Sequence, residues 1–257
     1  MAGMFCGSGL IYCAVNRQLL APSFIICAHC PWWLPYAEAT IGITLFFGLF
    51  ARCSAIGLIG LLCFAIGKHG ICECLDLLPM LGMGLYFLIS GRGSYSIDRL
   101  LNLENRSETR PVELGYLLLR ILTGSGLMIL AIDEKLLHPQ LALDVLTSMP
   151  NLNFMHAYMS NSLFVLLTGL VELSLGFLIA AGTFPRTAAV ILAGTFAATS
   201  LIFGTSEIFG HASFYGIVIL VVLRGRGQVT LPTYLRCLSD CLRFARGIGR
   251  QCLALGK

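Results

Sequence analysis

Long apolar runs separated by short polar segments dominate this chain of 257 residues. Several of the runs approach or exceed the roughly 17–25 residues that cross a bilayer as a helix. The pattern therefore predicts an all-α integral membrane protein with eight transmembrane helices. We expect these helices at residues 3–22, 33–51, 53–69, 76–91, 112–137, 160–183, 187–204 and 208–223.

The pattern occurs twice along the chain. Residues 38–98 align without a gap to residues 172–232 at a constant offset of 134. For the residues before position 38, the offset between matching positions is only 117. The second copy therefore has additional residues before its second helix. Each copy has four helices, an even number, and we therefore expect two parallel repeats related about the membrane normal. The matched pairs include Glu38 and Glu172, Gly42 and Gly176, Gly48 and Gly182, Arg52 and Arg186, and Glu73 and Glu207.

The two copies define the predicted domain organisation. Residues 1–91 form the first four-helix unit, and residues 112–227 form the second. Between them, the polar residues 92–111 form a cytoplasmic linker. The basic tail at 228–257 carries an apolar stripe at helical spacing, which favours an amphipathic helix on the anionic membrane surface. A disordered basic tail is the alternative.

Composition and charge support a membrane protein. Hydrophobic residues make up 57% of the chain and charged residues 12%, whereas soluble domains have roughly 45–50% and about 25%. With both termini in the cytoplasm, all but three of the 17 Lys and Arg fall on the cytoplasmic half, as the positive-inside rule requires. The exceptions are Arg17, Lys68 and Lys135. The net charge of +4 therefore reflects the orientation of the chain in the membrane. We expect the lipid bilayer, and not a nucleic acid, as the partner.

Scattered polar positions in the second copy match a known family. Residues 114–227 resemble the DoxX family of small four-helix membrane proteins, which includes the DoxD-type thiosulfate:quinone oxidoreductase subunit. The first copy looks like a degenerate unit, because it keeps Glu38 and Arg52 but has Gly3 in place of the first arginine and Gln18 in place of the lysine. The residues that carry the resemblance are Arg120, Lys135, Glu172, Gly182, Arg186, Glu207 and His211.

The resemblance implies a function in sulfur and thiol redox chemistry. It points to quinone as the cofactor, to a redox or assembly partner subunit and to the bacterial inner membrane, with both termini cytoplasmic. The residues by themselves name no cofactor. The alternative is a non-catalytic membrane protein, either a small-solute transporter or an assembly partner of another complex.

Three charged or polar side chains are expected at one depth in the outer leaflet. Lys135, Glu172 and His211 each lie about 21–22 Å along a helix from an arginine at its cytoplasmic end. A charge at that depth needs a partner, so we expect a Lys135–Glu172 ion pair with His211 nearby. Such a pair could only fix helix packing, or it could line a substrate, quinone or proton site. In the remaining alternative, the side chains do not pair and each extends to the membrane interface independently. The other polar intramembrane candidates are Arg120, Glu38 and Glu207.

Four cysteines of the first unit are expected on the outer side, and they are the candidate catalytic residues. Cys27 and Cys30 have the CxxC spacing of redox dithiols, and Cys72 and Cys74 lie in another outer loop. The interpretations left open are an exchanging redox relay, an inert disulfide between the loops, a soft-metal site and no joint role. No residue is assigned as a metal ligand. We expect a membrane component of thiol or sulfur-compound oxidation coupled to quinone.

Overall fold

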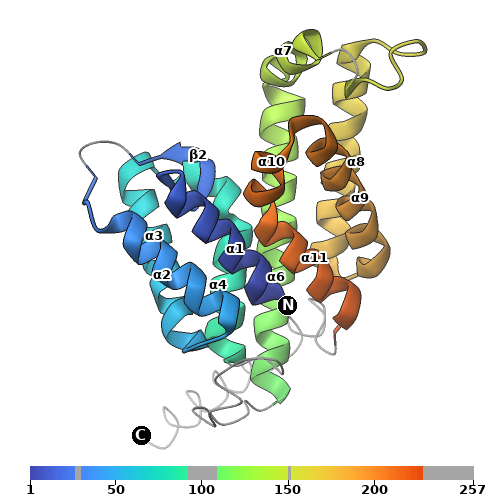
Figure 1. Ribbon diagram of the computed structural model, residues 1–257. Helices are drawn as coiled ribbons and strands as arrows, with labels where there is room; N and C mark the ends of the chain where they lie inside the picture. The colour runs from blue at the N-terminus through green and yellow to red at the C-terminus, as the bar shows by residue number, and fades with distance from the viewer. Residues whose placement is uncertain (27–29, 92–108, 150–151, 228–257) are drawn as a thin grey trace, which may run out of the picture.

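The computed structural model describes residues 1–26, 30–91, 109–149 and 152–227 (Figure 1). Most of the predicted linker and the whole predicted tail lie outside these ranges. The first half contains α1 (Ala2–Val15), α2 (Leu34–Phe47), α3 (Ala51–His69), the 3₁₀ helix η1 (Glu73–Leu77) and α4 (Leu78–Ser90). The second half contains α6 (Thr109–Leu130), the π-helix η2 (Ala131–Leu137), α7 (Gln140–Ser148), α8 (Asn161–Ala181), α9 (Pro185–Phe203), α10 (Thr205–Gly210) and α11 (Ala212–Arg224).

Five segments are long and apolar enough to cross a membrane, which indicates an integral membrane protein. They are α3, η1 with α4, α6 with η2, α8 and α9. Large apolar side chains such as Phe177, Val190 and Leu201 are exposed on α8 and α9, as expected for helices that face lipid. The helices α1, α2 and α11 are also apolar but shorter than these five.

The first helix is shorter than predicted. It ends at Val15, and the chain then forms an antiparallel hairpin from β1 (Gln18–Leu19) and β2 (Ala21–Ile25). Pro22 favours an extended conformation at the residue before it, and the backbone N–H of Leu20 donates to the Glu38 carboxylate instead of to a helical carbonyl. The prediction of a helix through residue 22 was therefore wrong, whereas the predicted all-α class is confirmed, since the described chain is helical apart from this short hairpin.

Three smaller differences concern the second half. The helix expected at residue 112 already begins at Thr109 as α6. Two short helices, α7 and α10, were not predicted. The first of them occupies the segment by which the second copy is longer than the first, so the additional residues form a helix beyond the end of α6 (Figure 1).

The helices pack in a closed series that joins the two halves. The helix α1 packs against α2 and α11, while α4 packs against α3 and α6. The helix α6 also packs against α8, and α9 connects α8 to α11. Figure 1 shows α6 between the two halves, with α1 beside α11. One apolar core contains Leu58 of α3, Leu119 of α6 and Ile217 of α11, so the halves share their interior.

The two turns that join long helices have the same backbone conformation. Gly48 follows α2 with φ 66°, and Gly182 follows α8 with φ 73°. Each glycine ends its helix in the left-handed conformation that Gly adopts without steric cost. Two residues later Phe50 and Phe184 have φ 46° and 48°, which is unusual for a bulky residue.

Candidate functional site

Lys135 and Glu172 form an ion pair between η2 and α8. The Nζ of Lys135 contacts Oε2 of Glu172, and the two side chains are 22% and 30% exposed. Gly169, one turn before Glu172, makes room for the lysine, because a methyl group there would lie 2.9 Å from Cβ of Lys135. The predicted Lys135–Glu172 pair is therefore confirmed.

Further carboxylates surround this pair. Glu134 interacts electrostatically with both Lys135 and Glu172, and it also repels Asp76 of η1. The lysine belongs to a π-helical segment, a conformation that occurs frequently at functional sites. Asp133 also interacts electrostatically with Glu134, so Lys135 lies in a group that contains the carboxylates of Asp133, Glu134 and Glu172.

His211 lies against aromatic rings at the start of α11. Its ring is centred 4.6 Å from that of Phe196 on α9 and 5.9 Å from that of Phe214. Phe196 also contacts the ring of Tyr215, whose hydroxyl is 3.1 Å from Oγ of Ser200. Glu207 belongs to α10, but its side chain lies outside the described part of the structure.

Arg120 is fully buried at the opposite end of the α6–α8 pair. Its Nη1 donates a hydrogen bond to the backbone oxygen of Arg226 at 2.6 Å. The guanidinium lies 5.2 Å from the centre of the Tyr116 ring and directly against Gly182. The hydroxyl of Tyr116 in turn donates to the backbone oxygen of Gly225 at 2.6 Å. Arg120 therefore holds the end of α11 against α6, apart from the Lys135–Glu172 pair.

Sequence reasoning missed the other members of this basic end. The carboxylate of Glu113 pairs with Arg224 at 3.6 Å, and the Arg224 guanidinium lies over the rings of Tyr86 and Tyr116 at 5.8 and 5.4 Å. The repeated Gly-Arg-Gly sequence at residues 225–227 is the signal that could have directed attention to this end.

Glu38 is buried in α2 and holds the hairpin. One carboxylate oxygen accepts the N–H of Leu20 at 2.7 Å, and the side chain is 0% exposed. The second oxygen, Oε2, has no hydrogen-bond partner among the described residues, and neither has Oε1 of Gln18. Leu20 has φ 65°, so Glu38 stabilises a turn in a strained conformation. The structure thus separates Glu38 from the Lys135–Glu172 pair.

Three of the four candidate cysteines, Cys30, Cys72 and Cys74, are described, and Cys72 and Cys74 are free thiols. Cys74 is buried in the apolar core, Cys30 is half-buried against the same core, and Cys72 is exposed. The ring of Phe24 on β2 contacts that of His69 at 4.9 Å. This contact places the hairpin on the end of α3, immediately before the loop that carries Cys72. Cys27 lies outside the described residues.

Within residues 1–26, 30–91, 109–149 and 152–227, no group of three His, Cys, Asp or Glu side chains is arranged to hold a metal ion. Cys27 and His29 fall in a gap between these ranges. The soft-metal interpretation of the outer thiols therefore rests on residues that the structure does not describe.

Comparison of the chain with protein-family models, with curated proteins and with solved structures found no match.

Proposed function

We propose that this chain is a membrane component of thiol or sulfur-compound oxidation that transfers electrons toward quinone. The observation that supports this function best is the contact between Phe24 of the hairpin and His69 at the end of α3. The hairpin leads to Cys30 and the end of α3 leads to Cys72 and Cys74, so this contact brings together the segments that carry the two groups of cysteines. Oxidation of two thiols to one disulfide releases two electrons and two protons, the number that converts one quinone to its quinol.

The proposed architecture is eight spans in two parallel repeats resembling DoxX units. Three observations support it. The helices α3 and α9 both have 19 residues, and α4 and α11 both have 13, each pair at an offset of 134. The left-handed turns before α3 and α9 are the same. The packing of α4 on α6 also corresponds to that of α11 on α1.

The proposed location is the bacterial inner membrane, with both termini in the cytoplasm. Arg120, Arg186, Arg224 and Arg226 lie at one end of the second half, where α11 ends and α9 begins. This clustering supports the orientation, because Lys and Arg accumulate on the cytoplasmic side of membrane proteins. The cysteine-bearing loops would then face the opposite, oxidising compartment, in which thiol oxidation is favoured.

In this proposal the carboxylates beside Lys135 lie on the path of protons to quinone. Quinone reduction consumes two protons, and Glu134 would be the general acid, since its carboxyl group interacts electrostatically with Lys135 and Glu172. The aromatic surroundings of His211 provide an apolar surface of the kind that binds a flat ring.

A second candidate is a non-catalytic assembly partner. It is favoured by the satisfaction of charges inside the protein, since Lys135 pairs with Glu172 and Arg120 donates to the Arg226 carbonyl. A protein whose polar groups serve packing alone would have this property. The two candidates differ in what the thiols do, and thiol measurements therefore separate them.

The test equilibrates the purified protein in glutathione buffers of graded ratio and traps thiols with an alkylating mass tag. The redox function predicts a reduction potential of about −120 to −270 mV, above the roughly −300 mV of inert bridges. The Cys30→Ser variant should accumulate mixed disulfides because the resolving thiol is missing. Cys53→Ser is the matched control, since Cys53 is a free thiol at the start of α3, away from these loops. Thiols that stay reduced under all ratios, or a bridge that no ratio opens, would favour the assembly partner.

A further inference from the structure

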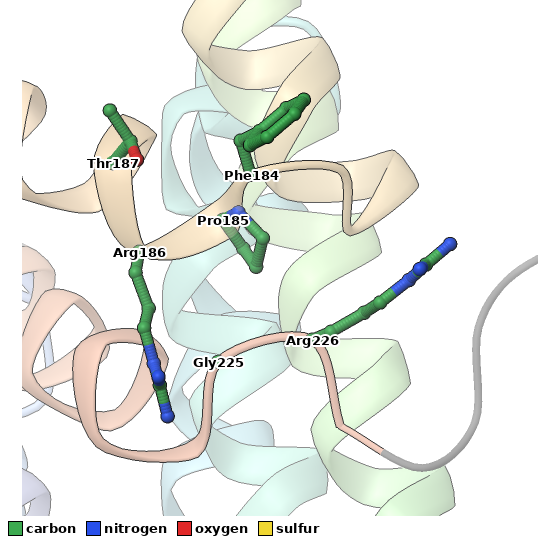
Figure 2. A pocket seen from close by; sticks show the side chains of 6 residues that line it. All are labelled: Phe184, Pro185, Arg186, Thr187, Gly225 and Arg226. Atoms are coloured by element: carbon green, nitrogen blue, oxygen red, sulfur yellow. The ribbon is translucent and has the colours of Figure 1, made fainter.

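A hollow of about 360 Å³ opens at the basic end of the second half (Figure 2). It lies between the turn that joins α8 to α9 and the chain just after α11. Figure 2 shows Phe184 and Pro185 on one side of the hollow and the backbone at Gly225 and Arg226 on the other. The lining residues are Phe184, Pro185, Arg186, Thr187, Gly225 and Arg226.

Two exposed guanidinium groups flank the hollow. Figure 2 shows the side chains of Arg186 and Arg226 on either side of the Gly225 backbone. Arg186 lies close against this glycine, because a methyl group at position 225 would lie 2.8 Å from its Nε. In the described part of the chain, no carboxylate forms an ion pair with either guanidinium. The carboxylate of Glu113 pairs with Arg224.

The walls of the hollow combine this positive charge with an exposed apolar surface. Phe184 is 78% exposed, and Pro185 forms the wall next to it. The turn connects α8 and α9, two helices long and apolar enough to cross a membrane. The hollow therefore lies where a hydrocarbon layer ends and headgroups begin. The first turn of α9 also contributes backbone N–H groups, whose partial positive charge favours an anion.

From this combination we propose that the hollow binds an anionic phospholipid. The phosphate sits between Arg186 and Arg226, and the glycerol and the start of an acyl chain lie on Phe184 and Pro185. A free phosphate ion would use the two guanidinium groups but would leave the exposed aromatic ring unused. Anionic lipids are also concentrated in the cytoplasmic leaflet, the side on which basic residues accumulate. The site is independent of the proposed thiol chemistry.

The test uses the purified full chain in detergent and native mass spectrometry. The probes are phosphatidylglycerol, phosphatidylcholine with the same acyl chains, and inorganic phosphate. The site predicts retention of phosphatidylglycerol over phosphatidylcholine. It also predicts that inorganic phosphate, up to millimolar concentration, neither binds appreciably nor displaces the lipid. Equal retention of the two lipids would overturn the proposal, and displacement by phosphate would identify a soluble anion as the ligand instead.

Three variants localise the binding. Arg186→Gln and Arg226→Gln should each weaken phosphatidylglycerol binding about fivefold, the value expected for one Lys or Arg near a lipid surface. Phe184→Asn removes the ring but keeps a residue that tolerates the left-handed conformation, and it should weaken the binding of both lipids. Arg52→Gln is the matched control, because Arg52 occupies the corresponding position after the turn at Phe50. It should bind as the wild type does, and an equal loss in Arg52→Gln would show nonspecific charge attraction and refute the site.

Discussion

Gly124 of α6 and Gly176 of α8 meet where the two helices cross, and a methyl group on Gly176 would lie 2.7 Å from the backbone oxygen of Gly124. The obstacle is a backbone atom, so the helices themselves would have to move. Small residues supply such close contacts in membranes, where lipid offers no hydrophobic drive between helices. We expect Gly176→Ala to lower the free energy of unfolding by about 1–3 kcal/mol. Thermal unfolding in detergent measures the loss.

Gly194 provides the control within the same half. It lies in the middle of α9, and a methyl group there would meet nothing within 4 Å. Gly194→Ala should therefore be neutral or should stabilise the protein by up to about 1 kcal/mol, because Ala is the better helix former. Equal destabilisation by the two variants would show that the crossing of α6 and α8 does not depend on close backbone contact.

The ion pair between Lys135 and Glu172 predicts coupled stabilities. Glu172→Gln leaves the lysine without its partner, and Lys135→Met leaves the carboxylate without its counter-charge. Because both side chains are partly exposed, we expect a coupling energy of about 0.5–1 kcal/mol, with the double variant recovering part of the combined loss. Thermal unfolding of the four proteins in one detergent measures this coupling. Strictly additive losses would mean that the two side chains do not interact in solution.

The Lys135–Glu172 pair was predictable because it depends on spacing along single helices, and the apolar runs predicted a membrane protein, of which five segments are long and apolar enough to cross a bilayer. A fixed rise per residue converts positions in the sequence to depths, so two charges at equal depth on neighbouring helices can be identified in advance. The same reasoning correctly placed Arg120 at the opposite end of the helix.

The hairpin at Gln18–Ile25 shows what spacing does not reveal. Most of its residues are apolar, so the pattern does not distinguish it from a continuation of α1 after Asn16 and Arg17. The distant carboxylate of Glu38 accepts the N–H of Leu20 and stabilises the hairpin conformation instead. The packing of α1 on α11 and of α4 on α6 also depends on contacts between the halves, which local pattern does not encode. The hollow beside Arg186 likewise depends on the contact between the turn that joins α8 to α9 and the chain just after α11.

Glu38 predicts a difference between two substitutions. Glu38→Gln keeps an oxygen that can accept the N–H of Leu20, whereas Glu38→Leu leaves that buried N–H without a partner. An unsatisfied buried donor costs about 1–3 kcal/mol, so the Leu variant should be the less stable by that amount. Thermal unfolding in detergent compares them. If both variants unfold at the same temperature, the bond to Leu20 does not hold the hairpin in place.

The proposed orientation predicts opposite accessibility for two exposed sites at the ends of the helices. Ser23 lies in the hairpin near the cysteine-bearing loops, and Thr183 lies in the turn beside Arg186. In a background without other cysteines, an impermeant maleimide should label Ser23→Cys in intact cells. It should label Thr183→Cys only after the cells are permeabilised, because the basic end faces the cytoplasm.

Full labelling of both variants in denatured cells controls for expression. Labelling of Thr183→Cys in intact cells, together with protection of Ser23→Cys, would show the opposite orientation. The thiols of Cys30 and Cys72 would then lie in the reducing compartment, where the proposed oxidation is not favoured.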